Sequence, residues 1–399
     1  MTSTRRMPPP AAQPAQAVPK AAPQWVVPLS DVLVDEETER AVAEVIRSGW
    51  WSMGPQVQAF EEEFARFLQV EHAFAVANGT AALHLALLAV GCGAGDDVLV
   101  PSLNFVAAAN TIGHVGATPI FCDIEGPDRL NISPEDLEDA VGPATRAIVV
   151  MHYGGHPCRM DAIREVARRH GLIVIEDAAH APGASWRDRM CGTIGDIGCF
   201  SFFSNKNLPT GEGGMIVTDD PALAERVRLL RSHGMTTLTW DRHRGHAHSY
   251  DVVAQGFNYR LDEVRAAIGR VQLRRLPANN AARGAIVAQY RADLSAVSGL
   301  EMPFAPEPES RASHHLAVIL LPPGLARDEF RSTLAADGVQ TSVHYPPIHG
   351  FSFYADRARR RSLPATDAVA DRLVTLPLYP HMRDTDREAV SAAVKRAVG

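Results

Sequence analysis

The chain has 399 residues, enough to bury a large core in two domains or in one large domain with a smaller appendage. Its 39 basic and 46 acidic residues leave a net charge of −7, and this acidic balance disfavours nucleic acid as the main partner. No apolar stretch approaches the length that crosses a bilayer, and Arg5 and Arg6 precede proline and alanine instead of a continuous apolar run. We therefore predict neither a membrane span nor a secretory signal.

The cysteines indicate a reducing compartment. There are five, an odd number, and no pair has the Cys-x-x-Cys spacing. They lie mostly along apolar runs, at Cys92, Cys122, Cys158, Cys191 and Cys199. We expect them to be reduced packing residues in a cytoplasmic protein.

The N-terminal part begins with a tail and continues with two helices. Residues 1–24 are rich in proline, alanine and glutamine, a composition that predicts disorder. Apolar periodicity predicts helices over 37–47 and 57–68, and a Gly- and Trp-containing segment separates them. Trp51 in that segment is explained equally well by packing and by a place in a substrate cleft.

The middle of the chain alternates strand-like and helix-like runs. We predict strands over 74–77, 97–101, 119–123, 147–152 and 172–176, and between them helices over 81–88, 106–115, 134–141 and 159–170. This rhythm predicts an α/β fold with a mostly parallel sheet covered on both faces by helices. Because ligands bind at the carboxyl ends of such strands, Asn78, Asp177 and the residues after Pro101 mark a candidate site.

One lysine lies between strand ends. Strand-like runs over 199–203 and 215–218 flank a Gly-rich connection that carries Lys206. Desolvation in a cleft would favour its neutral amine, the form that attacks a carbonyl. A buried-strand run upstream ends in Glu176 and Asp177, of which Glu176 should point to the other face and be structural. Pyridoxal phosphate would use both pieces, since the lysine forms an imine with its aldehyde and an aspartate keeps its ring nitrogen protonated.

The rest of the chain completes the predicted organisation. Helices are predicted over 221–232 and 261–276, with a long functional loop at 236–249 between them. We divide the chain into a tail (1–24), a large cofactor-binding domain with an N-terminal helical segment (25–276) and a small C-terminal α+β domain (277–399).

Four motifs carry a family resemblance. They are Asn78–Leu87, Glu176–Ala181, Ser201–Leu208 with Gly211–Gly214, and Gly256–Arg260. Together they resemble the DegT/DnrJ/EryC1/StrS family of pyridoxal-phosphate-dependent sugar aminotransferases, from about Val27 to the C-terminus. The resemblance implies a fold-type-I transferase with pyridoxal 5'-phosphate as cofactor.

The resemblance implies roles for the residues at the strand ends. Lys206 would hold the cofactor and move the proton, and Asp177 would pair with the protonated ring nitrogen. Phe105 would stack on the ring. His180 would lie beside the ring, although a satisfied buried histidine explains it nearly as well. Phe203 stands where many relatives have histidine, which puts one local contact in doubt.

Phosphate contacts are implied at a strand-to-helix turn. Backbone N–H groups of Gly79, Thr80 and Ala81 converge there, although a simple turn explains these residues too. Ser201 resembles a further phosphate contact. Asn258 resembles the residue that reaches the phosphate of a neighbouring subunit's cofactor, which implies a homodimer with shared active sites.

The substrate residues are the least constrained. Trp51, Tyr345 and His349 would line the sugar site, although the turn around Pro346 explains the last two equally well. Arg242 and Arg244 could meet a diphosphate. The histidines of the same loop have no cysteine or carboxylate partner at a firm spacing, so no metal is predicted.

The expected reaction transfers an amino group from an amino acid, glutamate or glutamine, to a keto-sugar, most often nucleotide-linked, in amino-sugar or secondary-metabolite biosynthesis. Two alternatives stay open: another pyridoxal phosphate reaction, such as dehydration, aminocyclitol or amino-aromatic formation, and a cofactor-binding regulator without turnover. Relatives that dehydrate sugars carry histidine in place of Lys206, and this favours amino transfer.

Overall fold

The computed structural model describes residues 25–237, 249–355 and 361–399. The predicted tail and most of the 236–249 loop, including Arg242 and Arg244, lie outside the described residues. No described helix is long and apolar enough to span a membrane. All five cysteines are free and buried, as their scattered placement predicted.

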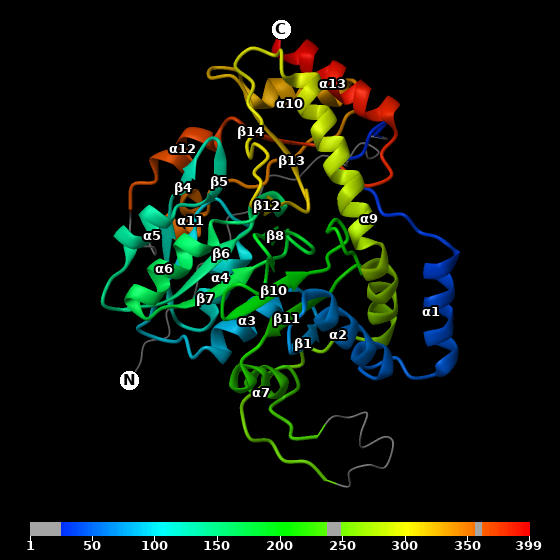
Figure 1. Cartoon of the computed structure of the whole chain (residues 1–399), viewed down its shortest axis with the longest axis vertical. Helices are drawn as coiled ribbons and strands as arrows, with labels where there is room; N and C mark the ends of the chain where they lie inside the picture. Colours follow the sequence, from blue (N-terminus) through cyan, green and yellow to red (C-terminus); the bar gives the residue numbers. More distant parts are fainter. Residues whose placement is uncertain (1–24, 238–248, 356–360) are drawn as a thin grey trace, which may run out of the picture.

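A seven-stranded sheet forms the centre of the molecule (Figure 1). Its order is β1-β11-β10-β7-β6-β2-β3, and five of its strands, from β10 to β3, run parallel. β11 is antiparallel to both of its neighbours, so β1 points in the same direction as the parallel strands. The mostly parallel α/β sheet is therefore confirmed. The bounds are β1 (His72–Val76), β2 (Asp97–Pro101), β3 (Thr118–Cys122), β6 (Thr145–Met151), β7 (Ile173–Asp177), β10 (Ile197–Ser201) and β11 (Gly214–Thr218).

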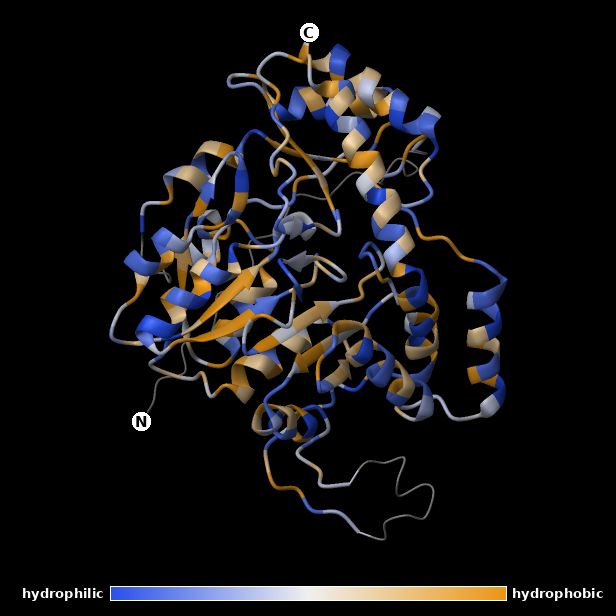
Figure 2. Cartoon of the chain, viewed as in Figure 1, coloured by the Kyte–Doolittle hydropathy of each residue, from blue (hydrophilic) through white to orange (hydrophobic). Residues whose placement is uncertain are grey.

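Helices cover both faces of the sheet. α3, α4 and α7 lie on one face, and α2, α5, α6 and the first half of α9 lie on the other. The strands are apolar on both sides, as fully covered strands require, and Figure 2 shows them as the most hydrophobic part of the fold. Alternate residues serve the two cores, so Val98 and Val100 pack with α3 while Leu99 packs with α6. The bounds are α1 (Glu36–Ser48), α2 (Pro55–Leu68), α3 (Gly79–Ala89), α4 (Ala107–His114), α5 (Pro134–Ala140), α6 (Met160–His170), α7 (Pro221–Leu230) and α9 (Glu263–Leu294).

The helix α9 is longer than predicted, because it continues through Pro277 to Leu294. An interior proline removes one helical hydrogen bond. Both halves of α9 are nevertheless held by packing: Leu273 and Leu276 belong to the core under the large sheet, and Tyr290 belongs to a separate C-terminal core. The division of the chain near residue 276 therefore falls inside a continuous helix.

The C-terminal core is built around a two-stranded sheet. β13 (Ala317–Leu320) pairs antiparallel with β14 (Leu373–Leu376), and α10 (Arg327–Ala336) and α13 (Asp384–Val398) pack with them. Figure 1 shows this part beside the second half of α9, at the far end of the molecule from α7. The remaining short elements are β4 (Ile124–Gly126), β5 (Arg129–Ile132), β8 (Ser185–Trp186), β9 (Arg189–Met190), β12 (Ser310–Arg311), α11 (Ser352–Ala355), α12 (Pro364–Ala370) and two 3-10 turns, η1 (Tyr153–Gly155) and η2 (Ile348–Gly350).

Candidate active site

The candidate site lies at the carboxyl edge of the central sheet. β7 ends at Asp177, β10 ends at Ser201, and the segment after β1 opens α3. Because these strands point the same way, their ends meet at one edge. The strand register agrees with this: Asp177 of β7 is opposite Cys199 of β10, and Ser201 of β10 is opposite Gly214 of β11.

Asp177 is a buried carboxylate that accepts one hydrogen bond from the described residues. Its side chain is 6% exposed and accepts a hydrogen bond from the backbone N–H of Ala179 at 3.2 Å. Burial raises its pKa, and the positive charge of Lys206 partly opposes that rise. A carboxylate has about four acceptor positions. Asp177 therefore keeps capacity for a further donor.

The neighbouring Glu176 points to the opposite face, as strand alternation predicted. It is fully buried and accepts hydrogen bonds from His152 Nε2 at 2.8 Å and from the backbone N–H groups of Gly192, Ile194 and Gly195. Burial alone would raise its pKa, but these donors outweigh it and the pKa is lowered. Its contacts are those of a structural residue.

Lys206 follows β10 in a tight turn. Its backbone N–H donates to the carbonyl of Phe203 at 2.8 Å, and its Nζ lies 3.5 Å from His315 Nε2. Burial lowers its pKa from 10.5 to about 8, against the opposing effect of Asp177, which favours the charged amine. At neutral pH the neutral amine is therefore far more populated than in an exposed lysine.

The start of α3 lies against Ser201. A Cβ built on Gly79 would be 2.7 Å from Ser201 Cβ, so only glycine permits this approach without a shift. Asn78 caps the helix by accepting from the N–H of Ala81 at 2.8 Å. The first-turn N–H groups of Gly79 and Thr80 have no carbonyl within the helix to bind. Together with the Ser201 hydroxyl they form a set of donors for an anion.

His180, Tyr345 and Phe105 form an aromatic group beside these residues. His180 Nε2 lies 2.9 Å from the Tyr345 hydroxyl, and Tyr345 lies 5.5 Å from Phe105 between ring centroids. His180 Nδ1 accepts the backbone N–H of Gly154 at 3.3 Å, so in the neutral ring the proton is on Nε2 and donates to Tyr345. Burial, and then the positive charge of Lys206, holds the pKa of His180 well below its usual value, which keeps the ring neutral.

The comparisons with known proteins agree with this geometry. The family model of the DegT/DnrJ/EryC1/StrS aminotransferase family matches residues 33–395. The chain belongs to this family. It is therefore a pyridoxal-phosphate-dependent aminotransferase.

Three relatives of this aminotransferase illustrate the range of the family. The spore coat polysaccharide biosynthesis protein SpsC of Bacillus subtilis is 42% identical over 379 residues, 93% of this chain and 97% of SpsC. The structure of the aminotransferase TlmJ from Streptoalloteichus hindustanus superposes with a TM-score of 0.87 at 36% identity, covering 94% of this chain and 99% of that one. S. venezuelae DesV, solved with a ketimine intermediate, gives 0.84 at 38% identity, covering 91% and 94%.

The residues present fit pyridoxal phosphate. The N–H and hydroxyl donors around Gly79 suit the phosphate of the cofactor. A side chain at position 79 would fill the space beside Ser201. Asp177 has acceptor capacity for a protonated ring nitrogen. Lys206 supplies a partly neutral amine within electrostatic reach of Asp177. Phe105 is 52% exposed, which leaves a ring face free to stack on a flat cofactor.

The loop that carries Tyr345 is fastened to the sheet edge by His349. His349 Nδ1 lies 2.7 Å from the Ser102 hydroxyl and its Nε2 lies 3.1 Å from Asp367. Ser102 is fully buried and also accepts the backbone N–H of His349 at 3.2 Å. These contacts make His349 an anchor of the loop, and they bring Tyr345 to His180.

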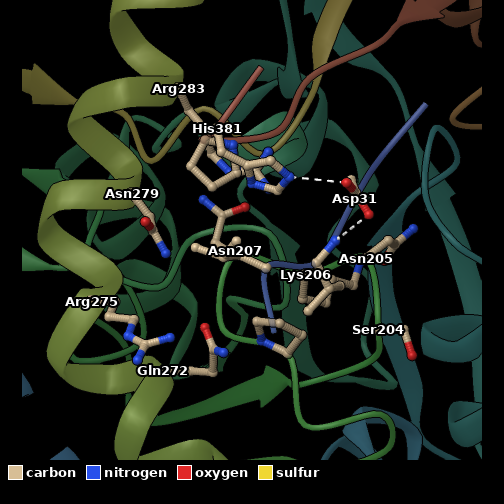
Figure 3. Close-up of a pocket in the computed structure, with 14 residues that line it drawn as sticks. Asp31, Ser204, Asn205, Lys206, Asn207, Gln272, Arg275, Asn279, Arg283 and His381 are labelled. Carbon is tan, nitrogen blue, oxygen red and sulfur yellow. Dashed lines mark hydrogen bonds and ion pairs between the residues drawn. The ribbon is translucent and has the colours of Figure 1, made fainter. Parts of the chain in front are cut away.

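A pocket lies on the side of Lys206 that faces α9 (Figure 3). Gln272, Arg275 and Arg283 project from α9 toward it, and the turn at Lys206 forms the opposite wall. Arg283 is 3% exposed and donates to the carbonyl of Leu378 at 3.0 Å. Lys206 thus lies close to α9 as well as to the sheet.

Two predicted site residues lie away from this group. Trp51 is 56% exposed and its contacts are with Ile46 in α1 and with Glu263 at the start of α9. Asn258 is exposed and forms an antiparallel bridge with Ser232. Neither has a described contact with Lys206 or Asp177.

Sequence reasoning missed His315 and Asn207, which the structure places at Lys206. Asn207 follows Lys206 directly, but nothing local marks His315, whose partner lies 109 residues away in the chain. His152 was also missed as the partner of Glu176. Its place at the carboxyl end of a predicted strand was the available signal.

Proposed function

We propose that this aminotransferase transfers an amino group from glutamate or glutamine to a keto-sugar, most often nucleotide-linked, for an amino sugar. The observation that carries the proposal is Lys206, a half-buried lysine whose pKa is lowered by desolvation, at the sheet edge near Asp177. Two relatives support the sugar: SpsC, named for polysaccharide biosynthesis, and Helicobacter pylori PseC, an aminotransferase involved in pseudoaminic acid biosynthesis. PseC is 26% identical with a TM-score of 0.87, covering 93% of this chain and 99% of that one.

Pyridoxal phosphate, when bound, supplies an aldehyde for covalent attachment and a ring that accepts electrons. Lys206 provides the attacking amine, because burial keeps part of it neutral near pH 7. With the cofactor bound, the Lys206 amine would take a proton from the substrate carbon that bears the amino group and donate it to the cofactor carbon that carried the aldehyde. One side chain serves both half-reactions, which predicts ping-pong kinetics.

The other cofactor residues bind and orient. Asp177, which is buried, would hold the proton on the ring nitrogen through a charge-assisted hydrogen bond. Gly79 and Thr80 with Ser201 would bind the phosphate, and Ala81, whose N–H is donated to Asn78, completes the turn that carries these donors. His180 donates its Nε2 proton to Tyr345, so the hydroxyl proton of Tyr345 is free to point toward a ligand.

The substrate side remains part of the proposal. Tyr345 lines the sugar site beside Phe105, supported by their ring contact. His349 contributes by fixing that loop. We further propose that Trp51 contributes to the substrate cleft and that Arg242 and Arg244 meet a diphosphate.

We also propose a homodimer with shared sites, in a cytoplasmic protein. Asn258 is exposed away from its own Lys206 and reaches the phosphate of the neighbouring subunit's cofactor. The free, buried cysteines support a reducing compartment. Within each subunit the large domain ends near residue 276 and the small one follows, which the core around β13 and β14 supports.

The chemistry of three lysines makes the test direct. The chain has only Lys20, Lys206 and Lys395, so borohydride reduction of the cofactor-loaded protein and peptide mapping should place the cofactor on Lys206 alone. Glutamate or glutamine should then convert the cofactor of untreated protein to its amine form, and a panel of nucleotide keto-sugars should reverse that change. Attachment at another lysine, or no conversion with any amino acid, would refute the proposal.

A further inference from the structure

His315 contacts Lys206 from a different part of the fold. It lies just before β13, in a segment docked on the main body by backbone hydrogen bonds, among them Ser313 N–H to Gly155 O at 2.9 Å and His315 N–H to Gly154 O at 2.8 Å. The side chain is 5% exposed. Its Nε2 therefore faces Lys206 Nζ, 3.5 Å away, from a fixed position.

The hydrogen bonds around Asn207 determine which nitrogen of His315 carries the proton. Asn207 Nδ2 donates to the backbone carbonyl of Ser313 at 2.7 Å and to Asn280 Oδ1 at 2.8 Å, so its Oδ1 is the acceptor that lies 3.1 Å from His315 Nδ1. An acceptor there requires a proton on Nδ1. In the neutral ring Nε2 is then a bare acceptor directed at Lys206.

The surroundings keep His315 neutral. The His180 ring lies 4.3 Å away between centroids, and Lys206, Arg283 and His344 also lower the pKa of His315, because each is positive when protonated. Burial first, and then these groups, hold the pKa of His315 well below its usual value. An imidazolium that would repel the Lys206 ammonium is thereby avoided.

We propose that His315 is a positioning residue that accepts one N–H of Lys206 at its unprotonated Nε2 and so fixes the direction of the amine. The pinned N–H leaves the amine lone pair free for the cofactor's aldehyde. Asn207 sets this arrangement by holding the proton on Nδ1. The inference rests on the proposed role of Lys206. It adds that His315 is the residue that orients the Lys206 amine.

Two substitutions separate positioning from packing. In His315→Gln the side-chain oxygen is as many bonds from the backbone as Nε2, so the contact with Lys206 is kept and that with Asn207 is lost. In His315→Asn the polar atom corresponds to Nδ1, so the contact with Asn207 is kept and that with Lys206 is lost. If the role of His315 is purely structural, His315→Gln should slow the reactions of Lys206. If His315 positions the amine, His315→Asn should slow them instead.

The first readout is the apo protein's capture of pyridoxal phosphate, together with reductive methylation of Lys206 by formaldehyde. Exposed Lys395 is the internal reference in the methylation, read by peptide mass. Loss of one oriented hydrogen bond should slow both reactions about 3- to 10-fold in His315→Asn and leave His315→Gln within about 2-fold of the wild type. Equal rates in the two variants, or a faster His315→Asn, would overturn the proposal.

The second readout is made on the wild-type protein, so it does not depend on whether a variant folds. Nitrogen-15 NMR of labelled histidines in the apo protein should give His315 the Nδ1–H tautomer, unchanged between about pH 6 and 8. An Nε2–H tautomer would overturn the proposal. If Lys206→Ala still captures the cofactor covalently, the proposed function fails; if that variant captures none while the Gln and Asn variants behave alike, only the role of His315 fails.

Discussion

Glu176 and Asp177 are neighbours on β7 and serve opposite faces of the central sheet. Both are buried, yet their hydrogen bonding differs: Glu176 is saturated by four donors, whereas Asp177 has one backbone donor. The pKa of Glu176 is lowered and that of Asp177 is raised. Burial alone therefore does not distinguish the two carboxylates; Asp177 is the candidate functional group because it has unused acceptor capacity near a lysine of lowered pKa.

The strongest test of this contrast is Asp177→Asn. The amide keeps the shape but cannot hold a protonated ring nitrogen, so we expect aminotransferase activity to fall by about 10²- to 10⁴-fold. Because Asp177 has few internal partners, the thermal midpoint of the apo protein should stay close to that of the wild type. Steady-state kinetics and thermal unfolding measure the two effects, and a large loss of stability would contradict the assignment.

The matched change, Glu176→Gln, should give the opposite result. Its amide would turn N–H groups toward the donors of His152 and the 192–195 turn, so we expect the free energy of unfolding to fall by about 3 kcal/mol. The remaining folded protein should keep most of its activity. Denaturant unfolding and assays on the folded fraction check this.

The pH dependence of that stability has a definite sign. Folding lowers the pKa of Glu176, so its contribution is complete above the unfolded value of about 4.3 and is lost as the pH falls through the lower folded value. Acid unfolding of Glu176→Gln should therefore be less steep than that of the wild type. An unchanged acid limb would mean that this carboxylate does not stabilise the fold.

The sequence predicted the strands of the sheet and the position of Asp177 and Lys206 at its carboxyl edge, for a physical reason. Apolar runs with turn residues at their ends are local signals, and Asp177 and Lys206 each stand at such an end. His315 and Tyr345 could not be assigned in this way, because their partners lie 109 and 165 residues away and depend on how the C-terminal core docks. The end of α9 was missed because Pro277 is a local stop signal that packing of both helix halves overrides.

The anion site formed by the N–H groups at the start of α3 should be disturbed by a methyl group at position 79. In Gly79→Ala the new methyl group would meet Ser201 Cβ at 2.7 Å, so the anion site must distort although alanine favours a helix. We expect the dissociation constant for pyridoxamine phosphate, which has no aldehyde for Lys206 to attack, to rise about 10-fold.

A pair of double variants identifies the cause. Gly79→Ala with Ser201→Gly and Gly79→Ala with Ser201→Ala both lack the hydroxyl, and they differ only in the Cβ that the new methyl would meet. The glycine version should bind pyridoxamine phosphate more tightly than the alanine version. Equal dissociation constants would show that the close approach does not shape the anion site.

The smallest expected effect is a shift in the pKa of the Lys206 amine. Burial lowers the pKa of Lys206 to about 8, so its methylation rate in the apo protein should rise with a midpoint near pH 8, while that of exposed Lys395 rises at higher pH. The negative charge of Asp177 favours the ammonium form, so Asp177→Asn should move the Lys206 midpoint below 8. Glu176→Gln, on the other face of the sheet, should leave that midpoint in place. If both substitutions move it equally, the two faces of β7 are not electrostatically distinct and the contrast between the neighbouring carboxylates fails.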